Sequence, residues 1–153
     1  CNYFYFLSYN HIVLLIKKEK TMKNQNEIFR FHNANPKGLK NANDCVIRAI
    51  SFATNKSWDK VHTELFDIAM KKKNTATSRK VFVPYLNSMG YIKKNQPKNE
   101  YNKRIKLYEF CEKYNDGIYI ISLRKHLTCV IDGIIYDTWN CCNHIVGNYW
   151  KVK

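Results

Sequence analysis

Three residues of this sequence carry side chains that together could perform nucleophilic acyl chemistry. Cys45 follows Asp44, which is a good N-cap for the helix predicted to begin at Cys45, and apolar residues at helical spacing come after it. In the first turn of a helix, unpaired backbone N–H groups and the helix dipole favour a thiolate, and the same groups can bind a developing oxyanion. His126 and Asp137 would supply the base and the group that orients it, so these residue types suggest a thiol-dependent hydrolase.

A β-hairpin is expected to bring the histidine and the aspartate together. Asp132-Gly133 is a two-residue turn signal between apolar segments over residues 126–131 and 134–139. In the register set by this turn, His126 and Asp137 are diagonal neighbours, roughly 5–7 Å apart at Cβ, which allows an imidazole–carboxylate hydrogen bond. The face that they share is expected to carry His126, Thr128, Val130, Ile135, Asp137 and Trp139.

Helices are predicted before this hairpin. Ser57 and Ser78 are suitable N-caps for the second and third helices, and Gly90 is suitable as the residue that follows the third. Pro84 lies inside the third segment, which is therefore either kinked or begins later. The four helical segments cover residues 45–54, 57–72, 78–90 and 103–114.

Strands are predicted where the apolar period changes to two. Besides the hairpin, they cover residues 118–123 and 148–152, whereas residues 22–43 and the Lys/Asn-rich stretch 93–103 are expected to be irregular. The order predicts a single α+β domain over residues 22–153, in which N-terminal helices carry the nucleophile and an antiparallel β-sheet follows.

The order of these chemical groups has a counterpart in a known family. A cysteine at a helix start, a histidine at a strand start and an aspartate on the next strand resemble the papain-like cysteine peptidase fold. Over roughly residues 30–150, the chain is also similar to small uncharacterised proteins of phages and prophages of low-GC Gram-positive bacteria. The segments that carry this likeness are Asn35-Pro36-Lys37-Gly38, Asp44-Cys45-Val46-Ile47-Arg48-Ala49-Ile50, His126-Leu127-Thr128, Asp132-Gly133 and Tyr136-Asp137-Thr138-Trp139.

This resemblance implies a papain-like fold with Cys45 as nucleophile, His126 as base and Asp137 as the orienting residue. It also implies a protein or peptide substrate and a location in the cytoplasm of a bacterial host cell. The chain departs from the family pattern before the nucleophile, where papain-like enzymes usually place a glutamine that completes the oxyanion hole. Leu39 and Lys40 occupy that neighbourhood here, so Asn41 and Asn43 are the candidate oxyanion donors.

Three further residues are candidate auxiliary groups. Arg48, one turn after Cys45, could bind a substrate carboxylate, help to hold the thiolate, or form a structural salt bridge. Trp139 could shield the site from water or simply pack against it. Asn140 is an alternative third member of the triad, although a regular strand would direct its side chain to the opposite face.

The remaining cysteines and histidines are expected to have structural roles. The six cysteines include no Cys-x-x-Cys pair, which favours free thiols in a reducing cytoplasm. Cys111 and Cys129 are expected in the core, and His32, His62 and His144 in solvated positions. Cys141, Cys142 and His144 could supply metal ligands with Cys129, but their spacing matches no usual zinc pattern. We expect no metal, and no cofactor because the chain has no Gly-rich phosphate loop.

The formal charge of +14 allows a different function. A catalytically inactive papain-like protein could use a basic surface to bind nucleic acid or an acidic host protein. Lysine, asparagine, isoleucine and tyrosine are abundant and have A/T-rich codons, so base composition also contributes to this charge. No membrane partner is expected, and the sequence gives no oligomeric state.

Residues 1–21 are expected to be a mis-called upstream extension. Cys1 begins the segment in place of a methionine, and the basic residues follow the apolar run, opposite to the order in a signal peptide. Back-translation of Lys17-Lys18-Glu19 allows a ribosome-binding sequence shortly before the codon of Met22. The alternative is a genuine amphipathic or anchoring N-terminus.

Overall fold

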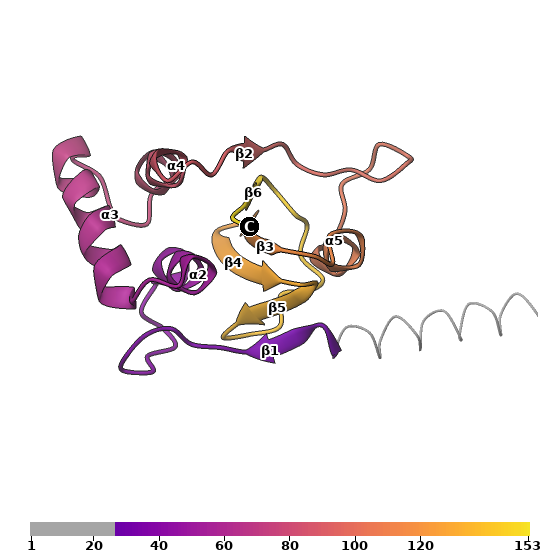
Figure 1. Ribbon diagram of the computed structural model, residues 1–153, viewed down its shortest axis with the longest axis horizontal. Coiled ribbons are helices and arrows are strands. Elements are labelled where there is room, and N and C mark those ends of the chain that lie inside the picture. Colours follow the sequence, from indigo (N-terminus) through magenta and orange to yellow (C-terminus); the bar gives the residue numbers. More distant parts are fainter. Residues whose placement is uncertain (1–26) are drawn as a thin grey trace, which may run out of the picture.

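The computed structural model describes residues 27–153, so the expectation for residues 1–21 lies outside the described residues. Over this range the fold is α+β, with four helices and one six-stranded mixed sheet (Figure 1). No helix of the described range is long and apolar enough to cross a membrane. The elements are β1 (Phe29–Phe31), α2 (Cys45–Thr54), α3 (Trp58–Lys72), α4 (Arg79–Ser88), β2 (Lys93–Lys94), α5 (Leu107–Lys113), β3 (Ile118–Leu123), β4 (His126–Ile131), β5 (Ile134–Asp137) and β6 (Tyr149–Lys151).

The predicted β4–β5 hairpin is confirmed in its turn and its register. Ile131 pairs with Ile134, and Cys129 pairs with Tyr136. The two loop residues have φ angles of 48° and 74°, as a type I′ turn requires at both central positions. Because the register is the expected one, the end of β5 lies beside the start of β4.

The expectation of a purely antiparallel sheet is wrong. The strand order is β1-β5-β4-β3-β6-β2, and β1 runs parallel to β5 at one edge. Strand β1 lies in the segment predicted to be irregular, and β2 lies in the Lys/Asn-rich stretch, where it pairs with β6. Both strands are at sheet edges and have only two or three residues, too few to produce a period-two pattern in the sequence.

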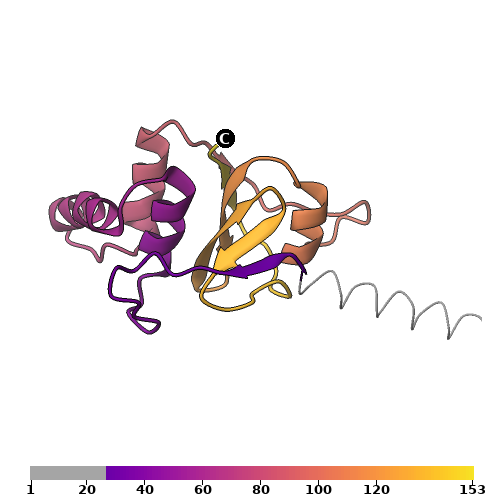
Figure 2. The ribbon, with the colours of Figure 1, turned by 60° about the horizontal axis from the view of Figure 1, so that its bottom comes forward.

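Two apolar layers cover the two faces of the sheet. Helices α2, α3 and α4 lie on one face and α5 lies on the other (Figure 2). The first layer includes Ile50 of α2, with Leu127 and Cys129 of β4, and the second includes Phe110 of α5 with Val130 of β4. The alternation along β4 therefore fixes α2, and with it Cys45, against the strand that begins at His126.

Two predicted boundaries are also wrong. The helix expected over residues 103–114 begins only at Leu107, because Lys106 pairs with Ile145 in a β-bridge and its N–H donates to the Glu109 carboxylate. The strand expected to reach residue 139 ends at Asp137, because the Asp137 carboxylate accepts a hydrogen bond from the next N–H, that of Thr138. In both places a side chain binds the backbone and sets the end of the element.

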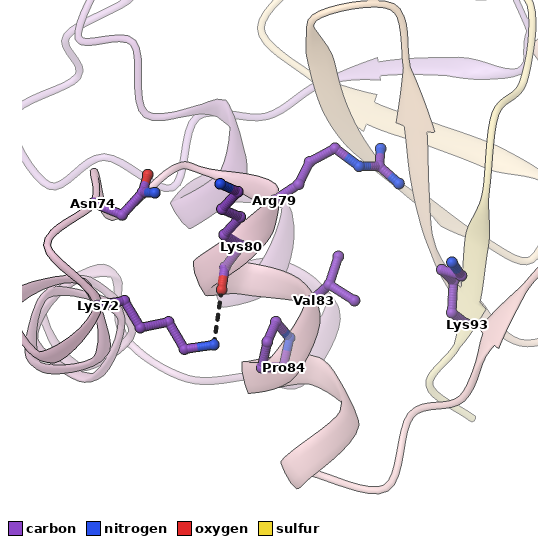
Figure 3. Close-up of a pocket in the computed structure, with 7 residues that line it drawn as sticks. All are labelled: Lys72, Asn74, Arg79, Lys80, Val83, Pro84 and Lys93. Carbon is purple, nitrogen blue, oxygen red and sulfur yellow. Dashed lines mark hydrogen bonds between the residues drawn. The ribbon is translucent and has the colours of Figure 1, made fainter.

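Helices α3 and α4 follow their predicted caps, Ser57 and Ser78. The hydroxyls of these serines accept hydrogen bonds from backbone N–H groups of the first turns. Helix α4 continues through Pro84. Proline has no N–H for the carbonyl four residues earlier, that of Lys80. Lys72 of α3 supplies the missing donor, with its Nζ 3.1 Å from that carbonyl oxygen (Figure 3).

Candidate active site

Cys45 is the first residue of α2, as predicted, and its side chain is partly exposed. Asp44 occupies the N-cap position, as predicted, but its carboxylate makes no hydrogen bond to a backbone N–H of the first turn. Helix geometry leaves the first backbone N–H groups without intrahelical partners. These groups therefore remain available beside the sulfur.

His126 and Asp137 form the predicted hydrogen bond, with Nε2 2.6 Å from Oδ2. Burial would raise the pKa of Asp137, but the His126 bond and charge and the Thr138 N–H hold it below its ordinary value. Burial would lower the pKa of His126, but hydrogen bonds with Asp137 and Cys45 outweigh this effect and raise it to about 9. At neutral pH the imidazole is therefore protonated and the carboxylate ionised.

The Cys45 thiol also interacts with His126. Burial alone would raise the pKa of Cys45, but a hydrogen bond with His126, one with the Leu127 backbone and the charges of His126 and Arg48 together lower it. Since Nε2 faces Asp137, Nδ1 is the ring nitrogen left for the sulfur. Burial raises the pKa of each of the other described cysteines, which are Cys111, Cys129, Cys141 and Cys142. Cys45 is thus the described cysteine whose pKa is lowered and not raised.

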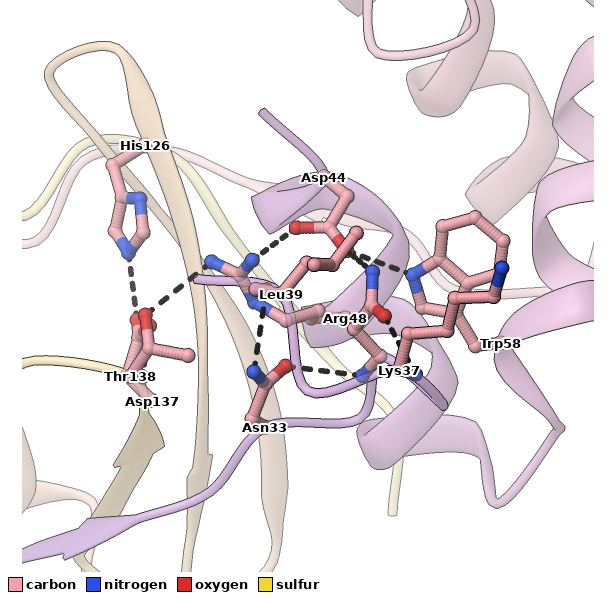
Figure 4. A network of polar contacts seen from close by, with 10 residues as sticks. Asn33, Lys37, Leu39, Asp44, Arg48, Trp58, His126, Asp137 and Thr138 are labelled. Carbon is pink, nitrogen blue, oxygen red and sulfur yellow. Dashed lines mark hydrogen bonds and ion pairs between the residues drawn. The ribbon is translucent and has the colours of Figure 1, made fainter. Parts of the chain in front are cut away.

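The carboxylate of Asp44 is 2% exposed and is the centre of a buried polar network (Figure 4). It accepts hydrogen bonds from Asn35 Nδ2 and Trp58 Nε1, each 2.9 Å long, and forms an ion pair with Arg48. A negative charge beside a thiol would disfavour the thiolate if it were uncompensated. Three donors compensate it here, and they tie the start of α2 to α3 and to the loop after β1.

Arg48 joins this network to the strand that carries Asp137. Its Nη2 lies 3.4 Å from the hydroxyl of Thr138, and the Thr138 N–H binds Asp137 at 2.7 Å (Figure 4). The guanidinium is buried and already paired with Asp44, so of the three roles considered for Arg48 the structural salt bridge is present. Its charge also lowers the pKa of Cys45, so it helps to hold the thiolate without lying in the open cleft.

A cleft of about 290 Å³ opens on the nucleophile. Cys45 and His126 line it together with Asn43, Ser122 and Arg79. Of the two candidate oxyanion donors, only Asn43 lines the cleft, and its backbone is in the left-handed conformation with φ 52°. Asn41 is exposed and does not line the cleft.

Trp139 and Asn140 occupy different positions around the site. The Trp139 ring lies 5.2 Å from the His126 ring and 4.9 Å from that of His144, and 40% of the residue is exposed. It therefore covers the imidazole from the solvent side. The side-chain Oδ1 of Asn140 instead accepts a hydrogen bond from the Cys142 N–H, so Asn140 shapes the loop while Asp137 contacts the histidine.

All three histidines expected to be solvated have aromatic partners, and the partner of His144 is Trp139. The rings of His32 and Phe52 lie 3.8 Å apart, and those of His62 and Trp58 lie 4.8 Å apart. Burial lowers the pKa of His32. The contact of His32 depends on how the loop after β1 packs on α2, whereas Trp58 and His62 are one turn apart on α3.

The predicted alternative metal set is not brought together. Within residues 27–153, the group whose possible ligand atoms lie within 4.8 Å of one another is His126, Asp137 and Cys141. Two of its members already share a hydrogen bond, and Cys141 Sγ lies 3.9 Å from Asp137 Oδ2. This group is part of the Cys45 site and not a separate centre.

Sequence reasoning missed the residues that support the triad. Asn35, Trp58 and Thr138 hold the Asp44–Arg48 pair, and Ser122 and Arg79 line the cleft. The turn sequence Asn35-Pro36-Lys37-Gly38 was a usable signal, because the Asn35 side chain accepts the Lys37 N–H within it. No spacing rule connects Trp58 with Asp44. No family model, curated protein or solved structure matches this chain.

Proposed function

We propose that this protein is a papain-like thiol hydrolase that acts on an amide or thioester carbonyl of a peptide or protein. The observation that carries the proposal is the continuous contact from the Cys45 thiol to His126 and from His126 to Asp137. Each of these residues has the pKa shift that its role needs: lowered for the nucleophile, raised for the imidazole and lowered for the carboxylate.

In the proposed acylation step, the Cys45 thiolate attacks the carbonyl carbon and forms a C–S bond, while the carbonyl electron pair moves to the oxygen. The first-turn N–H groups of α2 and the side chain of Asn43 are the candidate donors to this oxyanion. When the oxyanion collapses, the bond to the leaving group breaks and His126 gives that group its proton.

In the proposed deacylation step, neutral His126 takes a proton from a water molecule, whose oxygen attacks the thioester carbon. Collapse of this second oxyanion breaks the C–S bond and releases a carboxylic acid and the Cys45 thiolate–His126 pair. Asp137 stabilises the imidazolium in both steps and fixes Nδ1 towards the sulfur. Acyl transfer to an amine, or deamidation of a glutamine, would use the same groups.

The arrangement of elements supports the finer assignment of the fold. The nucleophile begins the first long helix, which packs against the strand that begins with the base, and the orienting carboxylate is on the neighbouring strand. We also infer a phage-encoded protein that acts in the bacterial cytoplasm. The five free cysteines of the described range fit such a reducing compartment.

The test is mass spectrometry of bacterial host lysate treated with the wild type or with Cys45→Ser. We expect wild-type-specific new peptide termini, or glutamine-to-glutamate conversions if the reaction is deamidation. His126→Ala should abolish the same changes. Identical lysates for the wild type and Cys45→Ser would contradict the proposal and favour the inactive binding protein.

A further inference from the structure

A basic groove adjoins the cleft of Cys45. It has a volume of about 710 Å³ and lies along α4 (Figure 3). The seven residues that line it are Lys72, Asn74, Arg79, Lys80, Val83, Pro84 and Lys93. Four of them are cationic and none is acidic. Within residues 27–153, no carboxylate forms an ion pair with these four cations. The groove therefore presents uncompensated positive charge.

Arg79 belongs to both cavities. It lines the groove with Lys80 and Lys93, and it lines the cleft with Cys45 and His126. Figure 3 shows its side chain extending from α4 towards the strands. A ligand that follows the groove therefore passes this guanidinium before it reaches the sulfur.

The Arg79 side chain is held in place. Nη1 donates to the Ser122 hydroxyl at 3.0 Å, and Nη2 donates to the side-chain Oδ1 of Asn148 at 3.1 Å. A guanidinium has five N–H donors, so these two bonds leave donors for a ligand. A fixed guanidinium with free donors suits a carboxylate, because its planar fork matches the two oxygens.

We propose that this groove is a substrate subsite for an acidic peptide segment, with Arg79 binding the Asp or Glu side chain nearest the bond that Cys45 attacks. The proposal rests on the proposed hydrolase function and adds its substrate class. Lys125, on the cleft wall next to His126, extends the positive surface. Neither cavity has an acidic lining residue that would repel such a segment.

A peptide fits the groove better than single-stranded nucleic acid does. Proteins that bind single strands without sequence preference combine positive charge with aromatic side chains on which bases stack. The groove has no aromatic lining residue. The Phe82 ring in the cleft is 4% exposed and lies 5.9 Å from the Arg79 guanidinium, so it is not a free stacking platform.

Binding is measured first, on full-length Cys45→Ser so that no turnover occurs. The probes are a fluorescein-labelled Asp/Gly peptide, its Asn/Gly counterpart and an oligouridylate of equal length. We expect the acidic peptide to bind at least about tenfold more tightly than the neutral one, with a preference that weakens as salt rises. Equal binding of the two peptides, or tighter binding of the oligouridylate, overturns the proposal.

Charge-removing variants then locate the binding. Arg79→Gln should remove most of the preference, and Lys80→Gln with Lys93→Gln should reduce it without touching the hydrogen bonds of Arg79. The matched control is Lys103→Gln, which removes one exposed charge from the distant loop before α5 (Figure 1). If these groove variants still prefer the acidic peptide over the neutral one as strongly as Cys45→Ser does, the binding site lies elsewhere and the proposal is overturned.

A reactive probe separates this proposal from the proposed function. The wild type is treated with acidic and neutral peptidyl acyloxymethyl ketones and, in parallel, with iodoacetamide. We expect Cys45 to react faster with the acidic ketone, and Arg79→Gln to equalise the two ketones. If iodoacetamide labels Cys45 but the two ketones react with it at equal rates, the acidic subsite is contradicted and the hydrolase is not. A Cys45 that iodoacetamide does not label contradicts the hydrolase, and the peptide-binding result still decides the groove.

Discussion

His126 Nε2 lies 2.6 Å from Asp137 Oδ2 at the point where β5 ends and β4 begins. The short contact exists because the two-residue turn sets the register of the hairpin, and because the Thr138 N–H fixes the other carboxylate oxygen. The imidazole is thereby held with its second nitrogen towards α2. The hairpin supplies the base and its orienting group, and the helix supplies the thiol.

The first prediction concerns the protonation of His126. In Asp137→Asn, the loss of the carboxylate should lower the pKa of His126 from about 9 by at least about one unit, because the carboxylate stabilises the imidazolium. The measurement is an NMR titration of the imidazole Cε1–H signal. In the wild type the ring should stay protonated from pH 6 to pH 8, and activity should fall as pH rises through about 9, where the imidazolium loses its proton. An unchanged titration in Asp137→Asn contradicts the assigned role of Asp137.

The second prediction concerns the relative reactivity of the cysteines. At pH 6.5, iodoacetamide should alkylate Cys45 before the other described cysteines, since its pKa is lowered and theirs are raised by burial. Peptide mapping by mass spectrometry measures the order. His126→Ala should slow Cys45 labelling about tenfold, because the imidazolium that favours the thiolate is gone. Equal labelling in wild type and variant means that His126 does not activate the thiol.

How far the sequence specified this site depends on the range of each interaction. The turn at Asp132-Gly133 determined the strand register, and that register correctly placed His126 within hydrogen-bond reach of Asp137, its diagonal neighbour. The capping serines determined where α3 and α4 begin. These signals are local, since each depends on a few neighbouring residues, and a single sequence is enough to interpret them.

The unpredicted part depends on contacts between distant segments. The Asp44 carboxylate was expected to cap its own helix, but the indole of Trp58 and the amide of Asn35 bind it instead. Strand β1 was missed because three residues at a sheet edge gain their structure from β5. Such pairings depend on how helices and strands pack, and propensities of single residues do not determine that packing.

The third prediction concerns the buried ion pair of Asp44 and Arg48. Asp44→Asn should destabilise the fold by about 3–5 kcal/mol, because it leaves a buried guanidinium without its counter-charge. Urea unfolding followed by fluorescence measures the free energy of unfolding. The control is Asp44→Asn combined with Arg48→Met, which removes both charges, keeps a side-chain oxygen for the donors of Asn35 and Trp58, and should be less destabilised than Asp44→Asn alone. If the double variant is the less stable protein, the pair contributes more than the avoidance of an unpaired charge.

The fourth prediction concerns the turn of the catalytic hairpin. Gly133 has φ +74°, and a Cβ there would lie 2.9 Å from the Cys111 carbonyl oxygen of α5. Gly133→Ala should therefore destabilise the fold by about 2–4 kcal/mol, combining left-handed strain with a backbone clash. Gly90→Ala is the matched control, because its φ is +83° but a Cβ would meet nothing within 4 Å, so only the strain of about 1–2 kcal/mol applies. Urea denaturation of both variants measures the difference. Equal destabilisation would mean that α5 gives way to the added methyl group, and that contact between α5 and the turn does not fix the hairpin that carries His126 and Asp137.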